Sequence, residues 1–498
     1  MKTARFLLCM AFLMMLAFAV MGSGCGGSGG GDVQIPTQNN NTTITSGDQT
    51  TNNNNGNTNT NTNTNTNNNT NTNTNTNTNT NGNADTNTNT NTNTNTNTNT
   101  NTNTDTTSDD QTSTNTNTNT NTETVTSADY SSTTANSNAI SLTDGSSATY
   151  TDITVSKTGD ATGSSDGTSG YDWVGTNAAI LASGGSKLTI SNATITTSAV
   201  GGNAVFSYGG SRSGNGDGTT ITISDSTITT SSNNSGGIMT TGGGVMNASS
   251  LTITTAGGSS AAIRSDSGGG TVTVNGGTYT ANGQGSPAIY STADITVADA
   301  DLTSGIAQVV VIEGGNSVSL NNCSLDAHHT SRNGQDSTYQ AVLIYQSMSG
   351  DASDGESSFS MTDGTLTNEN GDIFCVTNTT TTINLSGAAI TNNDSSGNFL
   401  RAESQNWGSS GSNGGNVTLN ASGQTINGNI IVDGSSSLTL NLKDSSTFNG
   451  AITMSSGGTV NVVVESGSTW TLTGNSNVTS TSGSGTITTG SYTLTTAQ

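Results

Sequence analysis

Basic residues are scarce in this chain of 498 residues. It contains 9 Lys and Arg against 33 Asp and Glu, for a formal net charge of −24, and loss of a leader carrying Lys2 and Arg5 would make the charge −26. Such a surface repels nucleic acid and anionic polysaccharide unless a basic patch or a divalent cation intervenes. The composition therefore argues against a nucleic-acid partner. We predict no cofactor, and Ca²⁺ is the one ion left open.

Cysteine is also rare, with only 4 in the whole chain. Cys9 falls in the predicted leader and Cys25 follows it, so Cys323 and Cys375 alone belong to the folded part. These two lie on different predicted strands, and Cys323 occupies a position that small residues share elsewhere. We interpret both as packing residues, not as a disulfide or a metal pair.

The N-terminus has the pattern of an export signal. Residues 1–24 combine a basic start, MKTAR, with an apolar run too short to span a bilayer. Ser23-Gly24-Cys25 resembles the cleavage box of bacterial lipoproteins, in which the cysteine is lipidated, and residues 25–37 form a Gly-rich tether. The alternative is ordinary cleavage after Ala19 and release. We predict attachment through Cys25 to the membrane at the cell surface, the outer membrane in a Gram-negative cell.

Residues 38–128 are almost wholly Asn and Thr, often in strict alternation. Hardly any apolar residue is available for burial, so nothing offsets the entropy lost on ordering, and we predict a disordered linker. This segment also dilutes the overall hydrophobic content to 28%. Residues 129–498 are long enough for a continuous core of Ile, Val and Leu.

A short motif recurs through that second part. In TTITISDSTITT, residues 219–230, apolar positions alternate on both sides of Asp225, which is followed by the small residue Ser226. Two alternating runs around an Asn, Asp or Gly predict two strands joined by a left-handed corner residue. The remaining copies begin at the following apolar residues: Leu188, Val272, Ile295, Val318, Phe359 and Ile383, with a degenerate copy at Leu251.

The spacing of the copies predicts a solenoid. Successive copies are 33, 51, 23, 23, 41 and 24 residues apart, and strand-only units of this size stack because one unit cannot bury its apolar face alone. A third strand precedes most copies, as at Ala178, Ala204 and Ala261. After Asn416, apolar strands recur at about 21 residues. We predict an all-β parallel β-helix over 129–498, with three strands per coil and about a dozen coils.

The corner series Asn192, Asp225, Asp299, Asn322 and Asp363 resembles the Asn-rich corner of the pectate-lyase-like right-handed parallel β-helix superfamily. The match covers residues 139 to about 391, and the later coils resemble autotransporter passengers and related adhesins. The superfamily holds lyases, hydrolases, tailspikes and adhesins, so the resemblance implies a right-handed fold but no single chemistry. The paired-Asp and His-Gly/Arg-x-Lys signatures of its polygalacturonases are absent from the sequence.

Long insertions flank the third strand, and we predict that they form the walls of a groove. Its floor would be the outward residues of that strand. Aromatic side chains can stack on sugar rings, and the forked donors of arginine can bind sugar hydroxyls, so such residues suit a sugar site. The predicted groove residues are Phe206, Tyr208, Met239, Arg264, Asp266, Tyr290 and Arg401 on the strand and Trp173 and Trp407 on the loops. The alternative is an ordinary surface with a solvated Arg264–Asp266 ion pair.

These observations predict an adhesin-like surface protein that binds glycans or a host or neighbouring surface without catalysis. The alternative is an extracellular polysaccharide lyase or hydrolase, for which Asp266 and Glu403, together with Glu313, are the weak catalytic candidates. Outward Thr rows, such as Thr189 and Thr222, resemble those of ice-binding β-helices and leave that function as a minor alternative. The His328-His329 pair is interpreted as a polar loop tip, not a metal site.

Overall fold

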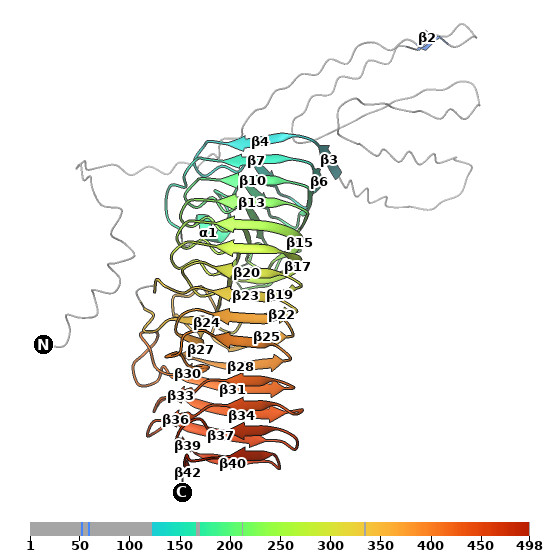
Figure 1. Ribbon diagram of the computed structural model, residues 1–498. Helices are drawn as coiled ribbons and strands as arrows, with labels where there is room; N and C mark the ends of the chain where they lie inside the picture. Colours follow the sequence, from blue (N-terminus) through green and yellow to red (C-terminus); the bar gives the residue numbers. More distant parts are fainter. Residues whose placement is uncertain are drawn as a thin grey trace, which may run out of the picture. The chain divides into compact units, whose positions relative to one another are not determined.

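The folded part of the chain is a parallel β-helix (Figure 1). The computed structural model describes residues 51–52, 58–59, 122–165, 170–211, 213–332 and 335–497. Residues 51–52 and 58–59 form a separate antiparallel pair, β1 (Thr51–Asn52) and β2 (Thr58–Asn59). The predicted signal peptide and Cys25 lie outside the described residues, as does most of the predicted linker.

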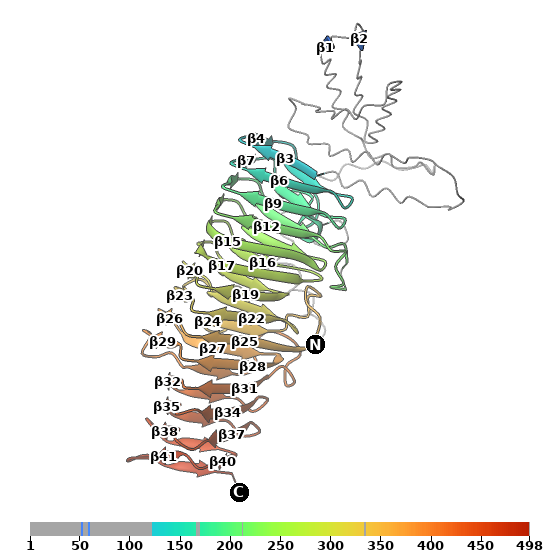
Figure 2. The same ribbon diagram turned by 90° about the vertical axis from the view of Figure 1, so that its right-hand side faces the viewer.

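Each coil contributes one strand to each of three parallel rows. Figure 2 views the first row, which follows a turn and leads into the corner. Its strands are β3 (Thr122–Thr126), β6 (Ser147–Thr151), β9 (Lys187–Ser191), β12 (Thr220–Ser224), β15 (Gly244–Thr255), β17 (Gly270–Ala281), β19 (Asp294–Ala298), β22 (Ser317–Asn321), β25 (Glu356–Thr362), β28 (Thr379–Ser386), β31 (Gly415–Ser422), β34 (Ser437–Lys443), β37 (Thr459–Val464) and β40 (Ser480–Ser482).

The second row lies after the corner, and the long strands β15 and β17 bend through the corner to serve both rows. Its other strands are β4 (Asp129–Ser132), β7 (Thr154–Lys157), β10 (Thr194–Thr197), β13 (Thr227–Thr230), β20 (Asp301–Ser304), β23 (Ser324–Ala327), β26 (Thr365–Asn368) and β29 (Ala389–Asn392), continued by β32 (Thr425–Asn427), β35 (Thr447–Asn449), β38 (Thr469–Thr471) and β41 (Thr486–Thr488).

The third row comprises a 12-stranded parallel sheet and a final pair of strands, so the described residues form fourteen coils, two more than the predicted dozen. Its strands are β5 (Ile140–Leu142), β8 (Ile180–Ala182), β11 (Val205–Tyr208), β14 (Ile238–Thr241), β16 (Ile263–Ser265), β18 (Ile289–Ser291), β21 (Val310–Glu313), β24 (Gln340–Tyr345), β27 (Asp372–Thr377), β30 (Leu400–Ala402), β33 (Ile430–Val432) and β36 (Ile452–Met454), followed by the pair β39 (Ser476–Val478) and β42 (Leu494–Thr496). In the described residues the one helix is α1 (Tyr171–Val174), and none is long and apolar enough to cross a membrane.

The corner residues adopt the left-handed conformation that the motif predicts. The φ angles are 52° at Asn192, 50° at Asp225, 54° at Asp299 and 51° at Asn322. A Cβ is strained in this region, and Asn, Asp and Gly tolerate it best. The corner between the first two rows is therefore set by single residues that can be recognised in the sequence.

The degenerate copy was predicted in the wrong register. Met246 pairs with Ile221 and Ala248 with Ile223, while Ile253 pairs with Ile228 on the second row. The corner residue is Ser250, with φ 52°. Leu251 therefore occupies the position directly after the corner, where the other copies have a small residue. The 51 residues between the copies at Ile221 and Val272 contain one complete coil.

The predicted start of the β-helix at residue 129 is also too late. β3 pairs in parallel with β6, and Ser127 has φ 56°, so the first described coil begins at Thr122. A second coil has its corner at Asp152, with φ 54°. Both precede the first motif copy seen in the sequence at Leu188.

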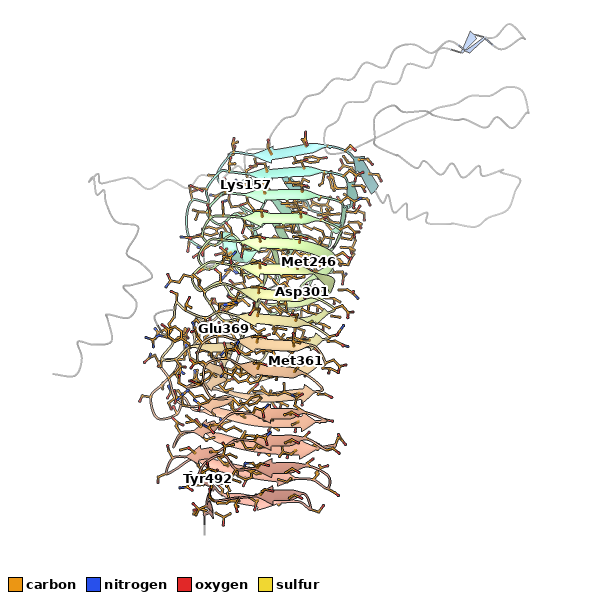
Figure 3. All side chains as sticks on the ribbon, viewed as in Figure 1. Lys157, Met246, Asp301, Met361, Glu369 and Tyr492 are labelled. Atoms are coloured by element: carbon orange, nitrogen blue, oxygen red, sulfur yellow. The ribbon has the colours of Figure 1, made fainter. Side chains whose placement is uncertain are left out.

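The core is one apolar column along the axis, built from the inward residues of all three rows. Figure 3 labels two of its members, Met246 and Met361, which are 0% and 1% exposed. Outside the column, amide side chains bond between coils: Asn441 Nδ2 donates to Asn420 Oδ1 at 2.8 Å, and Asn420 Nδ2 to Asn384 Oδ1 at 2.9 Å. Apolar burial and these repeated bonds hold each coil to the next.

Candidate functional site

The outward residues of the third row lie where alternation predicts, but loops cover many of them. Phe206 pairs with Met239, Met239 with Arg264, and Arg264 with Tyr290, so these side chains form one column on the outside of the sheet. Their exposure differs sharply along the column, and this decides which of them a ligand could reach.

Phe206 and Met239 are fully buried, so the prediction that they floor an open groove is wrong. Residues 170–178 fold back over the sheet, and Leu181, Phe206 and Met239 form a separate apolar cluster with Tyr208 at its edge. The insertion is held by Thr241 Oγ1, which donates to the Trp173 carbonyl at 2.7 Å. The insertion that was expected to form a wall of the groove therefore covers the outer face of the sheet instead.

Arg264 and Asp266 form an ion pair, but it is buried instead of solvated. Arg264 Nη2 lies 3.0 Å from Asp266 Oδ2, and Nη1 lies 3.4 Å from Oδ1 of Asp172, on α1. Burial lowers the pKa of Arg264, but the two carboxylates outweigh it and raise the pKa above its usual range. Burial also raises the pKa of Asp266 to about 7, with Arg264 opposing and Asp351 adding to the shift.

Glu313 is the centre of a second polar cluster, two coils further along. It is 1% exposed, and its carboxylate accepts hydrogen bonds from the hydroxyls of Tyr290, Ser347 and Tyr345. The Tyr345 hydroxyl lies 2.8 Å from the carboxylate oxygen. Burial, followed by the charge of Glu313, raises the pKa of both tyrosines. Tyr345 and Ser347 were not among the predicted site residues. Their outward position beside Glu313 could have been obtained by extending the strand register.

Arg401, Glu403 and Trp407 lie further along the sheet, in a third group that adjoins the Glu313 cluster through Trp407. Arg401 pairs with Asp372 and Glu403, and the Trp407 ring lies 4.6 Å from the Tyr345 ring, over an apolar patch. Strands β16 and β30 are five coils apart in the sheet, about 24 Å at the usual strand spacing. Asp266 and Glu403 therefore cannot act as an acid/base pair on one glycosidic bond.

The remaining candidates are structural. Cys323 and Cys375 are buried free thiols, as predicted. His328 forms a half-exposed pair with Asp326, whereas His329 is fully buried and its Nδ1 accepts from the Gln340 N–H at 3.0 Å. The interpretation of the pair as a polar loop tip therefore holds for His328 and is wrong for His329, because the chain buries the second imidazole. Within the described part of the chain, no group of three or more His, Cys, Asp or Glu side chains is placed to hold a metal ion.

An open groove lies at the corner between the third and first rows. Its volume is about 410 Å³. Its floor comes from four successive turns, and its ends are the insertions after β11 and after β24. The lining residues are Ser213, Gly214, Gly243, Ser267, Gly268, Gly269, Gly270, Thr271, Thr292, Ala293, Asp294, Gly315, Asn316, Gly350, Asp351, Ala352 and Ser353. The groove crosses four coils, which are stacked about 4.8 Å apart, so it runs along the helix axis.

Among the described residues that line it, the groove wall is polar, and the charged side chains of those residues are acidic. Backbone amides and carbonyls, hydroxyls and the Asn316 amide dominate the lining, and its charged side chains are Asp294 and Asp351. Glycine allows the backbone itself to form the floor. At Gly269, with φ 50°, a Cβ would lie 2.3 Å from the Thr292 carbonyl oxygen. The groove thus offers closely spaced hydrogen-bonding groups and little apolar surface.

The groove was not predicted, although it adjoins predicted residues. Ser267 follows Asp266, and Gly314 and Gly315 follow Glu313, so the two buried carboxylates lie next to its floor. The signal in the sequence was the run of Gly, Ser and Asn that follows β14, β16 and β21. No protein-family model, curated protein or solved structure matches the chain.

Proposed function

We propose that the protein is a cell-surface binding protein that takes up a glycan in the corner groove without changing it covalently. The observation that carries the proposal is the open polar groove across four coils, between two insertions. Hydroxyl-rich ligands are recognised by many short hydrogen bonds from preformed donors and acceptors. Backbone groups of a stacked β-helix are preformed, because neighbouring coils hold them on both sides.

Attachment to the cell surface forms part of the proposal and rests on the N-terminal sequence. A lipidated Cys25, followed by the long Asn/Thr segment, would present the β-helix away from the membrane. Resemblance to adhesins and autotransporter passengers is consistent with such a role. The partners we propose are glycans of a host or of a neighbouring cell.

The test is a glycan array with the purified protein and two matched variants. Thr271 and Thr278 are both exposed residues of β17, but Thr271 lines the groove and Thr278 lies beyond the corner on the second row. Thr271→Trp should fill the groove and abolish binding, and Thr278→Trp should leave it intact. Absence of glycan binding, or equal loss in both variants, would contradict the proposal.

One observation favours polysaccharide hydrolysis as a second candidate. Extending the register of β16, β18 and β21 places Asp266 and Glu313 in one column two coils apart, about 10 Å. This is near the separation that inverting glycosidases use, and the raised pKa of Asp266 suits a general acid. Glu313, however, is buried and already accepts hydrogen bonds from four hydroxyls, those of Tyr290, Tyr345, Ser347 and Ser349. Turnover that is lost in Asp266→Asn while binding persists would favour the enzyme.

A further inference from the structure

We infer that the outer face of the second row binds ice, through a regular array of threonines that lies apart from the corner groove. The inference does not rest on the proposed function. In four consecutive coils, β10, β13, β15 and β17 each present two outward threonines separated by one buried residue. The members of this threonine array are Thr194, Thr196, Thr227, Thr229, Thr252, Thr254, Thr278 and Thr280.

The threonines form two unbroken columns on an open face. Thr194 pairs with Thr227, Thr227 with Thr252 and Thr252 with Thr278, and the second threonine of each coil pairs in the same way. On one side each coil turns at a single left-handed residue, and on the other side the turns have equal length: 198–204, 231–237, 256–262 and 282–288. Figure 1 faces this row, with β10 and β13 side by side. Every member of the array is exposed or half-exposed, so a large flat partner can reach all of them.

The spacing of the array is close to that of oxygen atoms in ice. Coils stack about 4.8 Å apart, and alternate residues of a strand are about 6.6 Å apart. In ice each oxygen forms four tetrahedral hydrogen bonds of about 2.75 Å, which places second-neighbour oxygens about 4.5 Å apart and gives a repeat of about 7.3 Å along the stacking axis of the crystal. The mismatch is one step of about 0.7 Å along the strand and about 1 Å in total over the four coils. Water bound to the array can therefore join an ice lattice with small displacements.

Threonine supplies a fixed hydroxyl and a fixed methyl group at each point of the array. Its β-branched side chain is restricted at χ1, so both groups hold their positions. Thr196 Oγ1 donates to the Val155 carbonyl at 3.4 Å. Among the described residues, the other hydroxyls of the array have no protein partner. These hydroxyls can therefore bond to ordered water, which costs little compared with a direct hydrogen bond.

Strand propensity alone does not account for the array. Threonine suits a solvated strand, but the first row of the same coils has Lys187, Val245 and Asn247 at outward positions. Asn247 also interrupts the predicted column of Thr189 and Thr222. The array itself is uncharged, in a chain with a formal net charge of −24, and it offers no aromatic ring on which a sugar could stack. These features fit an uncharged solid with a two-dimensional repeat.

The experiment measures binding to ice directly. The full-length protein is tested for thermal hysteresis and for incorporation into ice that grows slowly from solution, beside an inert protein of similar size. We expect a gap between the melting and freezing temperatures, and enrichment of the protein in the ice. Absence of both effects would overturn the inference and leave the proposed function standing.

Matched variants assign the effect to the second row. Thr229 and Thr222 are exposed residues of one coil, on the second and first rows. Thr229→Lys should abolish incorporation into ice, because a strongly hydrated ammonium group would stand in the middle of the array. Thr222→Lys should retain it, and Thr252→Lys provides a second array variant on the next coil. All three positions are exposed, so the unfolding midpoints should change little. Equal loss in Thr222→Lys would overturn the assignment.

Two further comparisons separate the array from the corner groove and from a crystalline glycan as partner. Thr271→Trp should leave ice binding intact, because Thr271 lines the groove on the first row. Loss of ice binding in that variant would overturn the separation of the two surfaces. Adsorption to crystalline cellulose that is lost in Thr229→Lys, without any binding to ice, would show a crystalline glycan on the array and overturn the inference.

Discussion

The corner residue Asp225 gives the sharpest test of the coil architecture. Its φ is 50°, its side chain is exposed, and its N–H donates to the Ser249 carbonyl at 3.1 Å. A side-chain change therefore leaves that backbone bond in place and alters only the cost of the left-handed conformation. Asp225→Val should lower the free energy of unfolding by about 1–2 kcal/mol. Asp225→Asn and Asp225→Gly should be nearly neutral.

The assay is denaturation by guanidinium chloride, with the slope checked for constancy across the variants. Thr222→Val is the matched control, because Thr222 is an exposed outward residue of the same coil on an extended strand, where β-branching is favourable. That variant should change stability by less than about 0.5 kcal/mol. The reasoning fails if Asp225→Val is as stable as Asp225→Asn, or if Asp225→Gly loses as much as Asp225→Val.

Three further predictions concern single groups. Burial lowers the pKa of His329 to about 4, below its unfolded value, so the stability it contributes is present above about pH 6.5 and is lost as the pH falls toward 4. The stability difference between wild type and His329→Gln should fall over that interval by at most about 3 kcal/mol. Burial raises the pKa of Asp266 to about 7, so its contribution is present near pH 4 and is lost as the pH rises toward 7. The difference between wild type and Asp266→Asn should therefore have the opposite slope, and a flat difference at either site would contradict the assigned burial. Cys25→Ser should leave the protein unprocessed or release it into the medium, and normal anchoring of that variant would favour cleavage after Ala19.

Most of the coil path could be predicted from the sequence, because local rules determine it. Alternating Ile, Val and Leu set the inward faces, and an Asn, Asp or Gly supplied most corners. The third-row strands after Ala178, Ala204 and Ala261 follow the same alternation. The errors arose where a coil departs from its neighbours. Leu251 replaces a small residue, and Ser250 replaces the usual corner residue, so the pattern was read one strand late.

The candidate site was harder to predict, because its form depends on where the insertions fold. Alternation correctly places Phe206 and Met239 outward, but no local signal shows that residues 170–178 return to cover them. The same holds for Trp407, which packs on Tyr345 from a loop more than sixty residues later in the chain. The groove itself lies at turns whose Gly and Ser residues carry no pattern specific to binding.

Hydrogen–deuterium exchange with a bound oligosaccharide tests the central claim most directly. The glycan that binds best on the array is added at saturation, and exchange is compared with the free protein. We predict slower exchange at the groove floor, in the turns at Gly243, 267–270 and 315–316, and at the insertion containing Asp351. Exchange in the second-row strand β20 should not change. Protection confined to the second row, or to the loop around Trp407, would contradict the assignment of the binding site to the corner groove.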